Sequence, residues 1–266
     1  MLLTNNSEYK IFNIKHKVNS ELIFTEPIPM TELNILEDII RTVKYIHNFC
    51  TKHNIDYCIS DGTLLGCYRH NGIIPWDGDL DIMIFKDGFF KLKKLIDDFS
   101  QDGFEIFTIT PGFKVYYNKK PMGELFVYDY DTSIDMYRMA YPYIQLIDKP
   151  LYITSNIYYP SFITSDIYYP WQKYKSNDIF PLKKAYFENF IVNIPNNTLN
   201  ILNTTYNNSN LKECHYDKQH TEQHRVANNK LYKIGSVIEK IITYPLLLFI
   251  YYIVHRIINV FLIKFK

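Results

Sequence analysis

The stretch SDGTLLGCYRHNGIIPWDGDLDIMIF, residues 60–85, carries the densest set of chemically active side chains in the sequence. Asp79 and Asp81 stand two residues apart where its final apolar run begins. Because side chains alternate between the faces of a strand, both carboxylates are expected on one face and Leu80 on the other. Two like charges placed this close repel each other. A divalent cation between them would remove that cost, and Mg²⁺ or Mn²⁺ prefers carboxylate oxygens.

The first part of the stretch predicts a phosphate-facing turn. Asp61-Gly62-Thr63 follows the apolar run 55–60, which reads as a strand, and it precedes a short helical segment, 64–69. Gly62 lets the backbone approach a phosphate closely, and the N–H groups that open a helix suit an anion.

The same residues resemble the signature of the LicD/fukutin family, which are phosphotransferases with a nucleotidyltransferase fold. The family pattern runs Asp-Gly-Thr-Leu-Leu-Gly, then Arg-His, then Ile-Pro-Trp-Asp-Asp-Asp-(Ile/Val)-Asp. The chain follows it at 61–66, at 69–70 and at 74–81, with Gly78 where bacterial members often have Asp. An ordinary Asp-Gly-Asp turn before a strand is the alternative. Such a turn does not explain Arg69-His70 or Trp76 at the family spacing.

A third carboxylate is expected from a neighbouring strand, because the resemblance implies one in a (Val/Ile)-Asp-(Ile/Phe)-(Phe/Tyr) pattern. Asp135, within Ser-Ile-Asp-Met-Tyr at 133–137, matches that position. Asp129 and Asp131 are alternatives in a polar turn. An acid inside an apolar strand is costly unless it is paired or bound to metal. The competing interpretation is an acid on the solvated face of an edge strand.

The resemblance implies an α/β (α+β) fold, a nucleotidyltransferase-like mixed sheet with flanking helices. It implies transfer of a phospho-alcohol, of the phosphocholine or ribitol/glycerol phosphate type, from a CDP-linked donor to a hydroxyl of a glycan or glycoconjugate. Catalytic and Mg²⁺- or Mn²⁺-binding roles fall on Asp79, Asp81 and Asp135. Substrate-binding roles fall on Asp61, Gly62, Thr63, Arg69, His70, Trp76 and Lys183. The alternatives are transfer of a nucleotide monophosphate from an NTP, and a non-catalytic membrane-associated nucleotide-binding relative.

Hydrophobic periodicity predicts the remaining elements of this domain. We expect helices at 32–53 and 89–99. Short strands are expected at 104–110, 113–117 and 124–128. A further block at 179–206, with Ile-Phe-Pro-Leu, a strand and a short helix, also resembles the family. We therefore divide the chain into an N-terminal extension (1–30), a LicD-like domain (31–228) and a C-terminal helical tail (229–266).

Composition excludes some classes of function. The 266 residues are 47% hydrophobic, enough for a sizeable core, and the formal net charge of +1 gives no basic field for nucleic acid. The four cysteines form no Cys-x-x-Cys pair, and core thiols are favoured over disulfides. The N-terminus has no apolar segment typical of a signal peptide.

Three features near the C-terminus have two or more interpretations. The repeat at 153–160 and 163–170 predicts either a hairpin that walls an acceptor pocket or a duplicated surface insertion. A second feature is a sparse group of potential metal ligands, which is either a metal site or a polar loop: Cys214, His215, His220 and His224. The apolar helix predicted at 244–263 favours membrane association, with its polar side chains in one stripe. It would lie on the membrane, span it as an anchor, or pack on the protein core.

Overall fold

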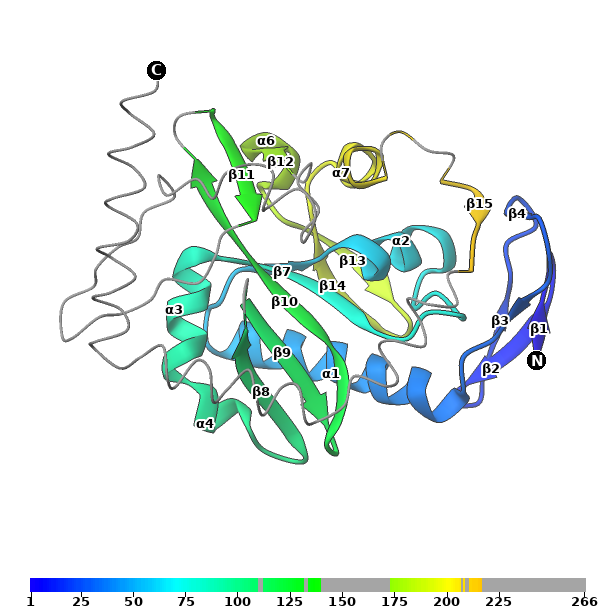
Figure 1. Cartoon of the computed structure of the whole chain (residues 1–266), viewed down its shortest axis with the longest axis horizontal. Coiled ribbons are helices and arrows are strands. Elements are labelled where there is room, and N and C mark those ends of the chain that lie inside the picture. Colours follow the sequence, from blue (N-terminus) through cyan, green and yellow to red (C-terminus); the bar gives the residue numbers. More distant parts are fainter. Residues whose placement is uncertain (110–111, 132–133, 140–172, 207, 209–210, 217–266) are drawn as a thin grey trace, which may run out of the picture. The chain divides into compact units, whose positions relative to one another are not determined.

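A central mixed sheet carries the residues on which the functional argument rests (Figure 1). The computed structural model describes residues 1–109, 112–131, 134–139, 173–206, 208 and 211–216, and all of these fall in one structural unit. The sheet has seven strands: β6 (Tyr57–Ile59), β7 (Leu80–Phe85), β8 (Phe104–Ile109), β9 (Gly112–Tyr117), β10 (Lys120–Asp131), β11 (Met136–Met139) and β12 (Lys173–Lys175).

The strand order is β12-β11-β10-β7-β6, and β9 pairs with β10 and with β8. The strand β10 is parallel to β7, whereas every other pair in the sheet is antiparallel. Because β10 is 12 residues long, it pairs with β9 along its first part and with β11 along its last four residues. The expected mixed sheet is confirmed, and β10 is longer than the predicted strand 124–128.

The helix α1 (Leu33–Lys52) closely matches the predicted helix 32–53 and crosses behind β9 and β10 in the view of Figure 1. Its buried side chains recur at three- and four-residue spacing, so one apolar face joins the core. The predicted helix 89–99 is instead two helices, α3 (Lys86–Lys94) and α4 (Ile96–Phe99), which are separated at Leu95. The helix α3 begins directly after β7 ends.

Short strands organise residues 1–30: β1 (Leu2–Leu3), β2 (Glu8–Ile11), β3 (Ile14–Lys17), β4 (Ile23–Phe24) and β5 (Ile28–Pro29). The strands β2 and β3 form a hairpin, and β1 pairs with β5. The strand β4 pairs in parallel with β15 (Glu213–Cys214). Leu3, Ile11, Val18 and Ile28 are buried in the same core cluster as the central sheet. This segment therefore packs on the domain through its own apolar side chains.

The short helix α6 (Ser176–Ile179) follows β12 and leads into the family-like block 179–206. This block contains a hairpin and a helix. The hairpin consists of β13 (Lys183–Phe187) and β14 (Phe190–Ile194), and the helix is α7 (Thr198–Thr205). Asn197 caps α7, because its side chain accepts a hydrogen bond from the backbone N–H of Asn200.

Several predicted features lie outside the described residues. These are the repeat at 153–160 and 163–170, His220 and His224, and the apolar segment 244–263 within the tail 229–266. Within the described part of the chain, we find no helix with both the length and the apolar content needed to cross a bilayer.

Candidate functional site

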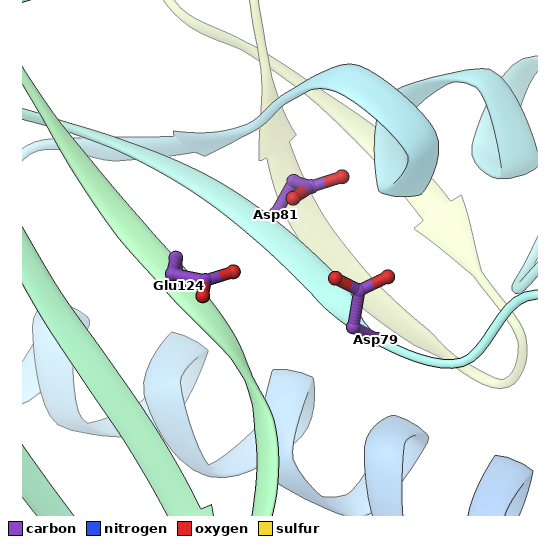
Figure 2. Close-up of side chains that lie close together, drawn as sticks. All are labelled: Asp79, Asp81 and Glu124. Atoms are coloured by element: carbon purple, nitrogen blue, oxygen red, sulfur yellow. The ribbon is translucent and has the colours of Figure 1, made fainter. Parts of the chain in front are cut away.

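Three carboxylates from two neighbouring strands meet beside the start of β7. Asp79 immediately precedes β7, Asp81 is its second residue, and Glu124 lies on β10. The parallel register places Glu124 directly opposite Asp81. One oxygen from each of the three carboxylates lies within 4.8 Å of the others. Figure 2 shows Glu124 extending from β10 toward the two aspartates. We call Asp79, Asp81 and Glu124 the acid cluster.

The two-residue period of the strand places the aspartates together. Leu80 and Ile82 alternate with them and are completely buried in the apolar core. Their burial fixes the face of β7 on which Asp79 and Asp81 lie, because a shift of one residue would move both carboxylates into the core.

The helix α2 (Asp61–His70) begins against the acid cluster. The backbone N–H of Gly62 donates to Oδ2 of Asp81 at 3.0 Å, and the backbone N–H of Asp81 donates to Oγ1 of Thr63 at 2.8 Å. A Cβ at Gly62 would lie 2.9 Å from Oδ2 of Asp77 and 3.2 Å from Oδ2 of Asp81. Glycine therefore leaves room for carboxylate oxygens at the start of the helix, and the Asp-Gly-Thr turn fixes the position of Asp81.

Electrostatics makes the acid cluster costly without a cation. Burial raises the pKa of Asp79 well above its usual range, and the charges of Asp81 and Asp77 raise it further. Burial also raises the pKa of Asp81, followed by the charges of Asp61 and Asp77. The hydrogen bond from Gly62 opposes the rise at Asp81. Ionised carboxylates are therefore disfavoured here unless positive charge is supplied.

The donor set fits a hard divalent cation. The three side chains offer only oxygen atoms, close enough together to share one ion. Mg²⁺ and Mn²⁺ favour carboxylate oxygens, and Mg²⁺ is commonly held by one or two carboxylates together with substrate phosphates. A bound cation would also offset the repulsion that raises both aspartate pKa values.

The structure places Asp135 away from this group, contrary to the expectation from sequence. Asp135 has a positive φ of 57° in an exposed turn before β11, where it accepts a hydrogen bond from the Tyr130 hydroxyl. The next residue, Met136, pairs with Asp131, the last residue of β10. At roughly 3.3 Å per residue, Asp131 lies about 23 Å along the strand from Glu124. In the structure, Glu124 rather than Asp135 lies beside Asp79 and Asp81.

The predicted substrate-binding residues separate into two groups. Asp61, Gly62 and Thr63 lie beside the acid cluster, as the previous contacts show. The guanidinium of Arg69 instead donates to the backbone carbonyls of Leu211 and, at 2.8 Å, Glu213.

Trp76 and His70 lie in packed surroundings. Trp76 is buried and packs edge-on against Phe24, with ring centroids 5.5 Å apart. The ring of His70 also lies 5.5 Å from that of Trp76, and burial is the main cause that lowers the pKa of His70 to about 3. On the β13–β14 hairpin, the exposed Lys183 donates to the backbone carbonyl of Asn196 at 2.7 Å.

Sequence reasoning missed two residues at the acid cluster, Glu124 and Lys114. The sequence predicts Glu124 as the first residue of a short strand, 124–128, whereas it lies inside the longer strand β10. Lys114 is a single cation between the apolar Phe113 and Val115. A charged residue within an apolar strand is the signal that could have revealed both, since such a residue needs a partner.

Comparison with known protein families identifies the domain that contains these residues. A family model described as the LicD/FKTN/FKRP nucleotidyltransferase domain matches residues 54–197. This range contains the acid cluster, α2 and the β13–β14 hairpin.

Two relatives illustrate the range of similarity. An uncharacterised protein of Rickettsia prowazekii is 31% identical over 170 residues, which cover 63% of this chain and 53% of the relative. The lipopolysaccharide cholinephosphotransferase LicD of Haemophilus influenzae is 36% identical over 73 residues, which cover 27% of this chain and 24% of that enzyme. The matches thus span about half the length of the first relative and about a quarter of the second. Because the family model covers more than half of the sequence, the chain belongs to the LicD/FKTN/FKRP nucleotidyltransferase domain family.

Proposed function

We propose that this protein is a metal-dependent phosphotransferase that moves a phospho-alcohol from a CDP-linked donor to a hydroxyl of a glycan or glycoconjugate. The observation that carries the proposal is the acid cluster, which lies against the Asp-Gly-Thr turn of α2 within a LicD-type domain. The local similarity to a lipopolysaccharide cholinephosphotransferase supports phosphocholine as one candidate for the transferred group.

In this proposal, the residues of the site have different roles. Asp79, Asp81 and Glu124 would hold Mg²⁺ or Mn²⁺. When bound, that ion would neutralise charge on the donor diphosphate and on the transferred phosphoryl group. Gly62 and Thr63 keep Asp81 in place and leave space at the start of α2 for phosphate oxygens. The acceptor oxygen forms a bond to phosphorus, the bond between phosphorus and the CMP oxygen breaks, and CMP leaves with that electron pair. The hydroxyl proton passes to solvent.

A second candidate is transfer of a nucleotide monophosphate from an NTP. The description of the matching domain as a nucleotidyltransferase favours it, and the same acid cluster would serve. The products distinguish the two reactions, because phospho-alcohol transfer releases CMP and nucleotidyl transfer releases pyrophosphate.

The test uses the full-length chain in thermal-shift measurements with Mg²⁺ or Mn²⁺. The ligands are CDP-choline, CDP-ribitol, CDP-glycerol, CMP, CTP, ATP and UTP. A ligand that binds only the folded protein raises the melting temperature by mass action. We expect metal-dependent stabilisation by one CDP-alcohol, followed by CMP release when an acceptor glycan is added. Asp81→Asn is the matched control and should lose this stabilisation. Stabilisation by an NTP alone would support nucleotidyl transfer, and no stabilisation by any ligand would support a non-catalytic relative.

A further inference from the structure

A buried lysine faces the acid cluster from the opposite strand. Lys114 lies on β9, where the antiparallel register places it directly across from Glu124 on β10. Its Nζ forms an ion pair with Oε1 of Glu124. The side chain is only 1% exposed, so both the aliphatic stem and the ammonium are enclosed by protein.

The surroundings of Lys114 differ from those of the other paired lysines in the described residues. Lys86, Lys120 and Lys212 form ion pairs with side chains that are 32%, 54% and 58% exposed. Phe113 and Val115, on either side of Lys114, are completely buried. A lysine enclosed in this way is destabilising unless its charge is compensated. The compensating groups are the carboxylates of the acid cluster.

Lys114 reaches the other members of the cluster through Glu124. Its ammonium bonds to Glu124, and one oxygen of Glu124 lies within 4.8 Å of an oxygen of Asp79 and of Asp81. In agreement with this geometry, the positive charge of Lys114 lowers the pKa of Asp79, against the effects of burial and of the neighbouring acids. Glu124 retains a second carboxylate oxygen, which a metal ion can use while Lys114 holds the first.

We propose that Lys114 is the internal counter-ion of the acid cluster: its ammonium keeps the three carboxylates together while no metal is bound, and it holds Glu124 in position for the reaction. Lys114 is thus a positioning residue. The metal-dependent part of this inference rests on the proposed function, because it assumes that the cluster binds a divalent ion.

Two opposite consequences follow if Lys114 is removed. The metal-free cluster loses a buried cationic neighbour, so its carboxylates repel each other more strongly. A divalent ion should then bind more tightly, because the like charge beside it is gone. The transfer reaction should nevertheless slow, because Glu124 is no longer held. A lysine that only supported the fold would weaken metal binding and turnover together.

The experiment compares Lys114→Met, Lys114→Arg and the control Lys86→Met. The control removes another lysine–carboxylate ion pair to β10, the more exposed pair between Lys86 and Asp129 at 3.0 Å, at a position outside the acid cluster. For each full-length variant, Mn²⁺ affinity is measured by titration calorimetry on metal-free protein at one neutral pH. The melting temperature is recorded with and without Mn²⁺. The kcat for CMP release in the proposed transfer reaction is measured at saturating Mn²⁺.

We expect Lys114→Met to have a lower metal-free melting temperature than the wild type, a larger stabilisation by Mn²⁺ and about tenfold tighter Mn²⁺ binding. Its kcat should fall at least tenfold. Lys114→Arg should restore most of the metal-free stability, and Lys86→Met should bind Mn²⁺ as the wild type does. If Lys114→Met does not fold, the double variant Lys114→Met/Glu124→Gln removes both charges. It should be more stable without metal than Glu124→Gln alone, which leaves the lysine without its glutamate partner.

Two results would overturn the inference. The first is an equal loss of melting temperature in Lys114→Met with and without Mn²⁺, together with weaker Mn²⁺ binding. The second is a double variant that is no more stable than Glu124→Gln alone. If the wild type itself does not bind Mn²⁺, the proposed function fails instead. In that case, a larger loss of metal-free melting temperature in Lys114→Met than in Lys86→Met would support the counter-ion role of Lys114. An equal loss in the two variants would contradict it.

Discussion

The two ends of the segment 60–85 differ from its middle in the contacts of their polar side chains. At the ends, Gly62 and Thr63 contact Asp81, which lies beside Glu124 of the adjacent strand. In the middle, Arg69 donates to backbone carbonyls and Trp76 lies in the core. Both parts match one family signature, but only the ends gather oxygen atoms around a shared space. The proposed function therefore assigns chemistry to the ends of this pattern and support of the fold to its middle.

The largest expected effect lies at the ends of the segment, at the two aspartates of the acid cluster. Asp79→Asn or Asp81→Asn removes one carboxylate ligand while keeping nearly the same side-chain volume. We expect transfer activity to fall by about a hundred- to a thousandfold or more, because electrostatic stabilisation of the transition state is lost. Activity is measured as CMP release, and circular dichroism checks that the fold is retained. Wild-type activity in both variants would show that the metal assignment is wrong.

A second pair of variants tests whether Glu124 or Asp135 contributes to the transfer reaction. Glu124→Gln should reduce transfer about a hundredfold, since the third metal ligand loses its charge. Asp135→Asn should stay within about twofold of the wild type, because Asp135 lies in an exposed turn away from the acid cluster. The two variants are compared at several Mn²⁺ concentrations. A strong loss in Asp135→Asn with normal activity in Glu124→Gln would restore the assignment made from sequence.

The sequence predicts local features of the site better than its long-range contacts. The faces of Asp79 and Asp81 follow from the two-residue period of one strand. The place of Glu124 depends on the register between β7 and β10, which are far apart in the chain and whose pairing leaves no local pattern. The apolar neighbours of Asp135 predict a strand, whereas the structure has this residue in a turn, because aspartate also tolerates the left-handed conformation found here.

The role of Arg69 could not be predicted for the same reason. Its partners, the carbonyls of Leu211 and Glu213, are more than 140 residues away in the chain. A basic residue in a family signature suggests contact with an anion, but here a charged donor stabilises backbone carbonyls next to β15. Only tertiary structure distinguishes these two uses of an arginine.

The middle of the segment should respond in stability rather than in catalysis. Arg69→Met removes both guanidinium hydrogen bonds, and hydrogen bonds to charged groups contribute roughly 1.5–3 kcal/mol each. We expect the melting temperature to fall by about 6–24 °C, given roughly 3–6 kcal/mol for the two bonds and a change of roughly 2–4 °C per kcal/mol in a domain of this size. The kcat of the folded enzyme should change little. A tenfold higher KM for the donor at an unchanged melting temperature would indicate that Arg69 binds substrate.

The smallest expected effect is a difference between the wild type and a His70 variant in how the melting temperature depends on pH. Burial is the main cause that lowers the pKa of His70 to about 3, and the charges of Arg69 and His16 lower it further. The unfolded chain takes up a proton at this histidine near pH 6.5, whereas the folded protein does so only near pH 3. Stability from this group is therefore complete above about pH 6.5 and is lost as the pH falls toward 3, by roughly 1.4 kcal/mol per pH unit.

His70→Gln cannot take up this proton, so its melting temperature should fall less steeply than that of the wild type between pH 6.5 and 5.5. The expected difference over this interval is about 3 °C. The comparison concerns the slope alone, because the substitution also changes packing against Trp76 at every pH. Measurements with the metal chelated and with saturating Mn²⁺ should give the same difference in slope, since His70 is assigned to the middle of the segment, which supports the fold. A difference that disappears when Mn²⁺ is added would instead connect His70 to the acid cluster, and the division between the ends and the middle of the segment would no longer hold.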